Sequence, residues 1–381
     1  MATNNNNKAL NVPHLRCPEF SGEWKKVRLG EICNMLCGYA FNGEDIVEQG
    51  SYLLMRGINI TEGSIRHSSE LDRYYSGSIE KLDKYKLAVG DLVIGMDGSK
   101  VGRNSAIVSS YEDGSYLVQR VCRIKSSIGN NYILQFINNT KFHQYVDTVK
   151  TSSAIPHISL GDIQNFRISI PPTQDETDKI AKLFLLLDER IATQNKIIER
   201  LETLIKGITQ NITLHNKPNV RISECLECTS STLQESDALR SGTYPVYGAN
   251  GIVGYLDNYS TQDEAVYIIK DGSGVGTVSY VTGQCSTTGT LNTLQAKEGY
   301  SLQYLYYILK VFNFEPYKTG MAIPHIYFKD YGKAKIFCPS YTKQLQYARL
   351  LSAIDGKVST EQNSLASLSL QKQYLLRQMF I

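Results

Sequence analysis

The chain has 381 residues, of which 42% are hydrophobic, and this is enough apolar material for two or three globular cores. Its formal net charge is +3, from 40 basic and 37 acidic residues, so a nucleic-acid-binding face would have to be local. No apolar run is long enough to cross a bilayer, and the polar, Asn-rich residues 1–8 lack the apolar region of a secretory signal. We therefore expect a cytoplasmic protein.

Residues 24–172 are predicted to form a first globular domain, after a polar lead-in over residues 1–23. Short runs of β-branched and aromatic residues, broken by Gly, Asn and Asp, are typical of strands joined by turns. The predicted strands lie at 51–60, 91–95, 106–110 and 117–124. Apolar residues at helical spacing predict one helix over 131–149.

A glycine-rich segment, Asp97-Gly98-Ser99-Lys100-Val101-Gly102, follows the apolar run 91–95. Its two glycines allow the backbone to approach a partner closely, and its N–H groups could then contact a DNA phosphate. A hairpin turn explains the same residues. Both interpretations stay open, because the neighbours Arg103 and Asn104 are basic and polar.

Residues 173–216 are predicted to form one long helix, which has a single glycine, Gly207, and is closed by Pro218. A stripe of positions steps by three and four residues and is apolar at all but one of them, as in a coiled coil. The stripe consists of Phe184, Leu187, Ile191, Gln194, Ile198, Leu201, Ile205, Ile208 and Ile212.

Residues 217–340 are predicted to form a second globular domain, with strands at 265–270 and 277–282 and a helix at 300–312. A second long helix is predicted over 341–381. Its stripe has the same length, and its polar Glu361 falls on the same step as Gln194. The stripe consists of Leu351, Ile354, Val358, Glu361, Leu365, Leu368, Lys372, Leu375 and Met379.

Sequence motifs recur in the same order in the two halves of the chain. Ala154-Ile155-Pro156-His157-Ile158 returns as Ala322-Ile323-Pro324-His325-Ile326, and the glycine-rich segment returns as Asp271-Gly272-Ser273-Gly274-Val275-Gly276. Leu29-Gly30-Glu31-Ile32 matches Ile222-Ser223-Glu224-Cys225 more faintly. We infer a duplicated unit of one domain and one helix. The repeated histidines are interpreted as hydrogen-bonded junction residues in preference to DNA contacts.

The predicted fold class is α+β, with two similar mixed α/β domains, each followed by a long helix, and an internal pseudo-twofold duplication. Two matching stripes predict that the helices pair with each other, and a twofold relation makes that pair an antiparallel coiled coil. In the alternative, each stripe packs against its own globular domain. We rank the alternative lower because the stripes are narrow and long.

Sequence signatures of catalysis are missing from the chain. It has neither a phosphate-binding Gly-x-x-x-x-Gly-Lys-Ser/Thr loop, nor His-Glu-x-x-His, nor Gly-x-Ser-x-Gly, nor the Asn/Asp-Pro-Pro-Tyr/Phe tetrapeptide of amino-methyltransferases. The pairs Cys33/Cys37 and Cys225/Cys228 could conceivably hold zinc, but reduced and mostly buried thiols explain them better. We predict a binding protein that itself has no catalytic residues, metal or bound cofactor.

The order of motifs resembles the specificity subunits of type I restriction–modification systems over nearly the whole chain. In the first half, the resemblance rests on Val12–Phe20 with Trp24, on Leu29–Ile32, on Gly90–Ile94 with the following glycine loop, and on Pro172, Lys179-Ile180-Ala181 and Asp188. In the second half it rests on Tyr244–Tyr255, Pro339, Ala348 and Asp355. Tyr347, where Ile is expected, and Lys372, which interrupts the stripe, depart from the pattern.

The resemblance implies a DNA-binding subunit that lends sequence specificity to other chains. Each domain would be a target recognition domain that reads one half of a bipartite site in double-stranded DNA, and the helices would set the spacer. The implied partners are two methyltransferase subunits, which carry S-adenosylmethionine, and motor–nuclease subunits, which use ATP and Mg²⁺. The rival interpretation is a two-headed scaffold with a coiled-coil spacer that binds protein or sugar.

Base-edge contacts are expected from polar side chains near the glycine loops, since Arg and Lys favour guanine and Asn and Gln favour adenine. The candidates in the first domain are Arg56, Asn59, Lys100, Arg103, Asn104, Gln119 and Arg120. The candidates in the second domain are Tyr247, Asn250, Lys270, Ser273, Thr277 and Asn292.

Overall fold

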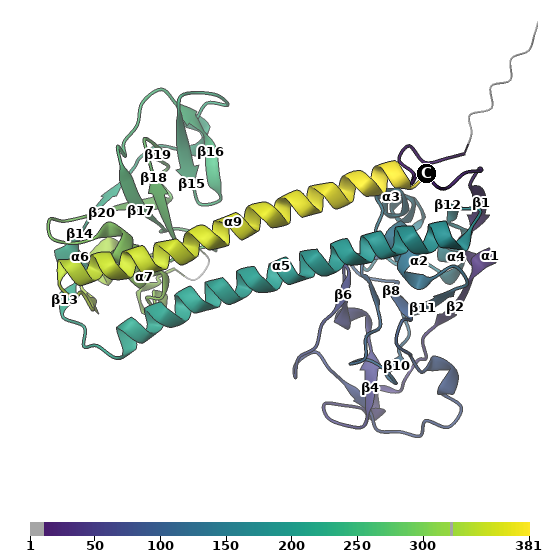
Figure 1. Ribbon diagram of the computed structural model, residues 1–381. Helices are drawn as coiled ribbons and strands as arrows, with labels where there is room; N and C mark the ends of the chain where they lie inside the picture. Colours follow the sequence, from purple (N-terminus) through teal and green to yellow (C-terminus); the bar gives the residue numbers. More distant parts are fainter. Residues whose placement is uncertain (1–10, 321–322) are drawn as a thin grey trace, which may run out of the picture. The chain divides into compact units, whose positions relative to one another are not determined.

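The computed structural model describes residues 11–320 and 323–381, and the chain divides into two compact units (Figure 1). Unit 1 comprises Met1–Ala192 and Ala366–Ile381, and unit 2 comprises Thr193–Leu365. The division falls inside both long helices, so each helix contributes to both units. Residues 1–10 of the predicted lead-in and Ala322 of the repeated motif lie outside the described residues.

Unit 1 contains two four-stranded sheets and several short helices. Its strands are β1 (Lys25–Arg28), β2 (Cys33–Cys37), β3 (Ile46–Val47), β4 (Tyr52–Met55), β5 (Ile60–Thr61), β6 (Ser64–Ile65), β7 (Tyr74–Tyr75), β8 (Leu92–Gly95), β9 (Ser105–Ile107), β10 (Tyr116–Leu117), β11 (Val121–Ser126) and β12 (Arg167–Ile170). Its helices are α1 (Leu29–Ile32), α2 (Asn130–Ile137), α3 (Thr140–Val149), α4 (Leu160–Asn165), the first part of α5 (Gln174–Leu214) and the last part of α9 (Tyr341–Met379), with 3-10 turns η1 (Gly43–Asp45), η2 (Gly57–Asn59) and η3 (Asp83–Tyr85).

Unit 2 repeats much of this order. Its strands are β13 (Val220–Arg221), β14 (Leu226–Ser230), β15 (Tyr244–Gly248), β16 (Gly251–Leu256), β17 (Glu264–Ile269), β18 (Val278–Thr282), β19 (Ser286–Thr287), β20 (Leu291–Ala296) and β21 (Lys335–Ile336). Its helices are the last part of α5, α6 (Ile222–Cys225), α7 (Leu302–Lys310), α8 (Phe328–Tyr331) and the first part of α9, with 3-10 turns η4 (Glu235–Asp237) and η5 (Glu315–Tyr317).

Strand pairing confirms the duplication that the motifs predicted. The sheet β2-β11-β8-β9 of unit 1 has the same order as β14-β20-β17-β18 of unit 2, and β1-β12 corresponds to β13-β21. In the second sheet of each unit, a short strand runs parallel to its neighbour: β10 beside β4, and β19 beside β15. The predicted α+β class with two similar domains is therefore confirmed.

The two long helices pair in an antiparallel sense. In unit 1, the ring of Phe184 on α5 lies 5.4 Å from that of Phe380, just after α9. Eight residues before Phe380, Lys372 forms an ion pair with Asp188, which follows Phe184 on α5. In unit 2, the Gln194 amide donates to the Glu361 carboxylate and, at 3.2 Å, to its carbonyl oxygen. Residue numbers thus rise along one helix as they fall along the other.

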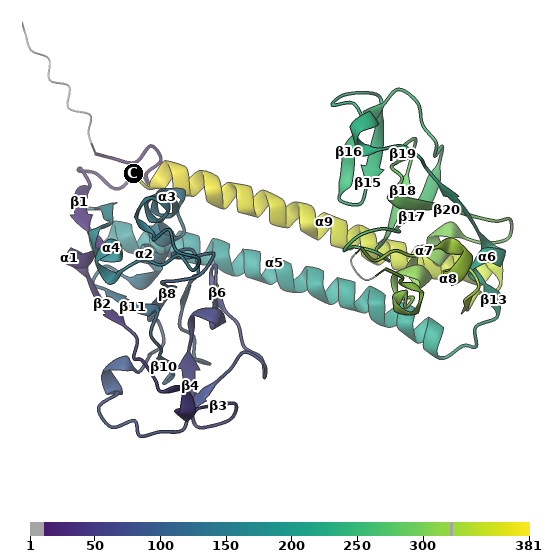
Figure 2. The same ribbon diagram turned by 180° about the vertical axis from the view of Figure 1, so that it is seen from behind.

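The core of unit 1 includes the last residues of the chain. Figure 2 shows the C-terminal end of α9 next to α3 of the same unit. Beyond its contact with Phe184, the ring of Phe380 lies 5.6 Å from Tyr132 and 4.7 Å from Phe136, both on α2. These side chains are buried together with Leu92 and other residues of the sheet. Burying one such aromatic side chain stabilises a fold by about 1.5–3 kcal/mol. The helices therefore pack both on each other and on the globular parts, which the sequence had presented as alternatives.

The core of unit 2 is closed by the other parts of the same two helices. Ile205 and Ile212 of α5 are buried with Leu351 and Val358 of α9, in one cluster with residues of β17, β20 and α7. Tyr347, which departs from the family pattern, is half-buried, and its ring lies 6.2 Å from that of Tyr304 in a stacked arrangement. A tyrosine therefore fits at this position without a break in the packing.

Two further features differ from or extend the sequence prediction. The single helix predicted over 131–149 is two helices, because Asn139 caps α3 by accepting from the Lys141 N–H at 3.0 Å. The described part of the lead-in packs on α5, where Arg16 forms two hydrogen bonds of 2.7 Å with the buried Glu176. The Trp24 indole donates to the same carboxylate at 3.3 Å.

Candidate functional site

Four loops of unit 1 meet at one place. They are residues 56–58 after β4, residues 96–104 between β8 and β9, residues 118–120 between β10 and β11, and residues 154–158 before α4. Backbone hydrogen bonds join them: Val118 N–H to Met55 O at 3.1 Å, Met96 N–H to Arg120 O at 2.8 Å, and Gly98 N–H to Pro156 O at 3.0 Å. We call these residues the loop cluster of unit 1.

Unit 2 forms the corresponding loop cluster with residues 249–250, 270–277, 288–290 and 323–326. The equivalent bonds are Thr288 N–H to Tyr247 O at 2.9 Å, Lys270 N–H to Thr290 O at 3.0 Å, and Gly272 N–H to Pro324 O at 2.9 Å. Isolated β-bridges join Asp97 to His157 and Asp271 to His325 in the two units. The repeated aspartate–glycine and proline–histidine motifs are therefore one structural element, present twice.

The glycine-rich segments are hairpin connections, β8 to β9 and β17 to β18. Gly98 and Gly102 have φ values of 92° and 72°, a region that favours glycine. Their N–H groups donate within the protein, to Pro156 and to Gly95. Because these donors are satisfied, we no longer expect these two glycine N–H groups to bind phosphate. The repeated histidines are half-buried, and His157 Nδ1 lies 3.0 Å from Thr151 Oγ1.

The predicted basic residues of unit 1 lie on or beside the loop cluster. Lys100 and Arg103 are in ion pairs of 3.1 Å, with Glu62 and Asp147 respectively. Both pairs are substantially exposed, and such pairs stabilise a protein by only about 0–1 kcal/mol, so a phosphate could replace the carboxylate. The half-buried Arg56 donates to Leu71 O at 3.4 Å. Asn104, half-buried, and Gln119, exposed, lie on the same loops.

Arg120 has a strained backbone at the centre of the loop cluster. Its φ is +70°, a left-handed conformation that costs a non-glycine residue about 1 kcal/mol or more. Its carbonyl accepts from Met96, while its side chain is exposed and forms no hydrogen bond or ion pair with the other residues that the structure describes. Strain of this kind is concentrated at functional sites. Arg120 is therefore the candidate that the geometry supports best.

Two candidate base contacts are inaccessible, and we correct that prediction. Asn59 is 1% exposed, and its side chain bonds to the backbone of Arg56 and Arg66 and to the Asp72 carboxylate. Asn292 is 3% exposed and bonds to Ser230 and to Tyr331. A buried amide with satisfied hydrogen bonds supports the surrounding loops and does not face a ligand. Sequence alone does not distinguish such an amide from an exposed one.

In unit 2, two predicted residues line one cleft. Tyr247 and Thr277 border a cleft of about 470 Å³ together with Tyr267, Ser279 and Tyr280. Rings and hydroxyls of this kind offer flat apolar surface and hydrogen-bonding groups to a polar ligand. Burial raises the pKa of Tyr247. Asn250 and Ser273 are exposed on the loops of this unit, and Lys270 is half-buried.

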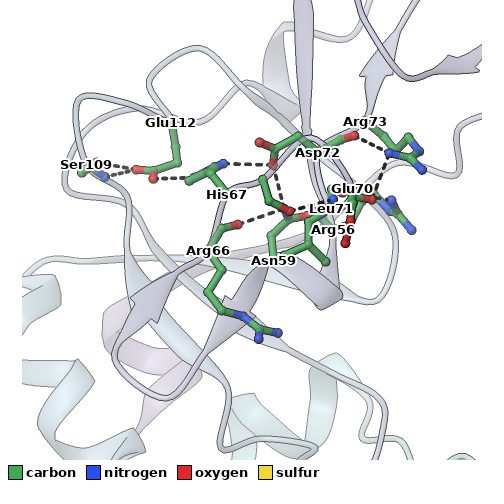
Figure 3. A network of polar contacts seen from close by, with 11 residues as sticks. Arg56, Asn59, Arg66, His67, Glu70, Leu71, Asp72, Arg73, Ser109 and Glu112 are labelled. Carbon is green, nitrogen blue, oxygen red and sulfur yellow. Dashed lines mark hydrogen bonds and ion pairs between the residues drawn. The ribbon is translucent and has the colours of Figure 1, made fainter. Parts of the chain in front are cut away.

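Sequence reasoning missed a polar network beside the loop cluster of unit 1. The His67 ring lies between two carboxylates, with Nδ1 at 3.0 Å from Asp72 and Nε2 at 2.9 Å from Glu112 (Figure 3). Burial raises the pKa of Glu112, but hydrogen bonds from Ser109 and His67 outweigh it, and the pKa of this carboxyl lies below its ordinary value. His67 and Glu112 lie far apart in sequence, so no local spacing signals the contact.

No group of three His, Cys, Asp or Glu side chains that could hold a metal ion occurs within residues 11–320 and 323–381. Cys33 and Cys37 lie on β2 of unit 1, whereas Cys225 and Cys228 belong to unit 2. Within the same described ranges, no helix is long and apolar enough to span a membrane.

Comparison with known proteins extends the likeness to both halves of the chain. A family model described as "Type I restriction modification DNA specificity domain" matches residues 21–203 and again residues 217–370. The Escherichia coli EcoAI specificity subunit of a type I restriction enzyme is 29% identical over 184 residues, which are 47% of this chain and 30% of that protein. The EcoprrI specificity subunit of E. coli is 28% identical over 134 residues, 35% of this chain and 32% of that protein.

These alignments span about a third of the length of either relative. The crystal structure of an S subunit of a type I restriction–modification system from M. genitalium superposes with a TM-score of 0.68 at 16% identity, over 97% of this chain and 99% of that one. At this identity the superposition shows a shared fold. Because the family model matches both halves of the sequence, this chain belongs to the type I restriction–modification DNA specificity family.

Proposed function

We propose that this chain is the non-catalytic DNA-specificity subunit of a type I restriction–modification complex, in which each unit reads one half of a bipartite site. The observation that carries the proposal is the repeated loop cluster, held by the same backbone bonds but carrying different side chains. Arg120 of unit 1 occupies the place of Thr290 in unit 2, since the carbonyl oxygen of each accepts the equivalent hydrogen bond, from Met96 N–H and Lys270 N–H respectively. Two loop clusters with the same backbone arrangement but different side chains suit two different half-sites.

Recognition then follows from charge and hydrogen bonding. Exposed cations such as Lys100 and Arg103 would exchange their carboxylate partners for phosphates and hold the duplex. Arg120 and Gln119 would reach base edges in unit 1, and Tyr247, Asn250 and Thr277 would do so in unit 2. In this proposal, the phosphate contacts position the DNA and the base contacts select its sequence.

The long helices have two roles in this proposal. α5 is continuous over Gln174–Leu214 and α9 over Tyr341–Met379, and such a helix pair would set the spacer between the half-sites. Leu183 and Leu186 are 38% and 54% exposed on one face of α5, where a methyltransferase subunit would cover them. S-adenosylmethionine would be bound by that subunit, and ATP and Mg²⁺ by motor–nuclease subunits.

Exchange of one recognition domain tests the proposal as a whole. Residues 25–172 are replaced by the first domain of another family member, and methylated bases are mapped in cells that express the complete system. One half of the methylated sequence should change while the other half stays the same. A change in both halves of the methylated sequence, or in neither half, would contradict the proposal that each domain reads one half-site.

Arg120→Asn tests the strained arginine, because Asn tolerates a left-handed backbone while it removes the guanidinium. A lost base contact should reduce discrimination at one position of one half-site by about 1–3 kcal/mol, roughly 5- to 150-fold. The measurement is competition binding with single-base variants of the site. Lys81→Asn is the matched control, because Lys81 is exposed, basic and has a φ of +72° outside the loop cluster. Equal effects of the two variants would argue against a base contact.

Matched insertions test the spacer role of the helices. A seven-residue repeat is inserted after Gln194 in α5 and another before Glu361 in α9, so that the stripes on both sides remain paired. Each insertion adds about 10 Å of helix, and we expect a longer spacer, by roughly three base pairs at ~3.4 Å each. The methylated sequence gives the spacer directly. An unchanged spacer in a folded, active variant would remove this role from the helices.

Leu186→Glu tests the docking face. A carboxylate placed in an apolar interface is costly to desolvate, so assembly with the methyltransferase subunit should weaken roughly tenfold or more. Association is measured by titration with the purified subunit, and melting temperature reports on folding. Lys196→Gln, an exposed polar change elsewhere on α5, serves as the control. Unchanged association of the Leu186 variant would place the docking surface elsewhere.

A further inference from the structure

The two units differ most clearly in one connection. In unit 1, β4 and its antiparallel partner β7 are joined by residues 56–73, whereas in unit 2 the equivalent strands β15 and β16 are joined by residues 249 and 250. We call residues 56–73 the insertion. It leaves the sheet at the loop cluster, because a Cβ on Gly57 would lie 3.6 Å from the Asp97 carboxylate. The insertion therefore occurs in unit 1, and the equivalent connection of unit 2 is only two residues long.

The insertion is folded and anchored to the sheet. Its strands β5 and β6 form a short hairpin, in which Ile60 pairs with Ile65. The tip of the hairpin bonds to β9, with the Gly63 N–H donating to Ser105 O at 2.9 Å. Ile60 is buried in the same cluster as Val93 and Ala106. This packing fixes the first half of the insertion, up to about residue 65.

His67 fixes the second half. Its two ring nitrogens contact Asp72, within the insertion, and Glu112, on the loop before β10. Each ring nitrogen lies within hydrogen-bond distance of a carboxylate oxygen, so the imidazole connects the insertion to the loop before β10. The side chains of His67, Asp72 and Glu112 are only 18%, 9% and 5% exposed. Glu112 is itself held by the Ser109 N–H at 2.7 Å and hydroxyl at 2.6 Å.

Asn59 transmits this restraint to two arginines. Its amide nitrogen donates to Asp72 at 3.1 Å and to the Arg66 carbonyl at 3.2 Å, while its oxygen accepts from the Arg56 N–H at 3.3 Å (Figure 3). These bonds fix the backbone at Arg56 and at Arg66. In Figure 3 the Arg66 guanidinium extends away from the carboxylates of the network. Arg66 is exposed, and Arg56 is half-buried.

We propose that His67 is a positioning residue for DNA recognition, and that the insertion which it clamps presents Arg66 and Arg56 to the half-site read by unit 1. The inference rests on the proposed function and adds a specificity element to it. Guanidinium groups pair with the O6 and N7 acceptors of guanine in the major groove. Arginines on a fixed backbone lose less conformational freedom on binding than arginines on a mobile loop. The contacts of His67 therefore favour discrimination between bases.

The test uses the full chain assembled with its methyltransferase subunit and a library of DNA sites randomised in both halves. The half read by unit 1 is assigned beforehand by the exchange of residues 25–172. His67→Ala should reduce base discrimination in that half at least fivefold and leave the other half unchanged. His67→Gln should restore part of it, because the Gln amide can still donate to Glu112. Arg66→Gln should affect a subset of the same positions.

Two controls separate positioning from general damage. His215→Ala removes an imidazole that lies just after the end of α5 in unit 2, and it should leave the unit 1 half unchanged. Glu112→Gln should broaden the same positions as His67→Ala, and the double variant should lose no more than His67→Ala alone, because that variant has already lost the contact with Glu112. If His67→Ala fails to fold, Glu112→Gln and Arg66→Gln decide the question.

The outcomes distinguish this inference from the proposed function. If the wild-type complex selects no bipartite sequence, the proposed function fails. If it selects one, and the His67, Glu112 and Arg66 variants select the same bases with the same stringency, the clamp inference alone is overturned. Equal broadening of both half-sites would also overturn it, because the effect would not be local to unit 1.

Discussion

The antiparallel pairing of α5 with α9 is the constraint on which the rest of the molecule depends. Both long helices contribute to both compact units: unit 1 takes in Ala366–Ile381 from α9, and α5 supplies Ile205 and Ile212 to the core of unit 2. Each core is complete only when both helices are in register. Polar groups at stripe positions define that register, since Gln194 bonds to Glu361 and Lys372 pairs with Asp188. An apolar stripe alone would tolerate a slip of one repeat, whereas a half-buried polar pair does not.

Once the cores are closed, the sheets determine where the loops lie. The central strands β8 and β17 are buried, and the hairpins that follow them begin with the repeated Asp97 and Asp271. The bonds that join the four loops run between backbone groups and so depend little on which side chains are present. Side chains on these loops are therefore able to differ between the copies while the frame stays the same. Arg120 in unit 1 and Thr290 in unit 2 illustrate this freedom, because their carbonyl oxygens accept equivalent backbone bonds while their side chains differ.

The sequence predicted the features that arise from periodicity and repetition. The helix stripes and the duplication are local or repeated patterns, and strand order and helix pairing confirm the fold that they imply. For the glycine-rich segments at Asp97 and Asp271, the sequence left a hairpin turn as one of two interpretations, and the structure shows the hairpins. The break between α2 and α3 was missed because apolar spacing continues across it, and only the capping Asn139 ends the first helix. Asn59 and Asn292 were misplaced because burial of an amide depends on partners such as Asp72 and Tyr331, which lie far away in sequence. The insertion was not anticipated for the same reason.

A duplicated frame also explains where the two units can diverge. A change at a strand would disturb the core that both long helices close, so large differences are tolerated mainly in the connections. The β4–β7 connection is such a place, and a long connection needs its own restraint, because each free residue that is ordered on binding costs about 1–2 kcal/mol in lost backbone freedom. His67, Asp72 and Glu112 restrain this connection within unit 1, and in the role that we propose for it they would do so before DNA binds. Unit 2, whose equivalent turn is two residues long, has its polar cleft beside Tyr247 and needs no comparable clamp.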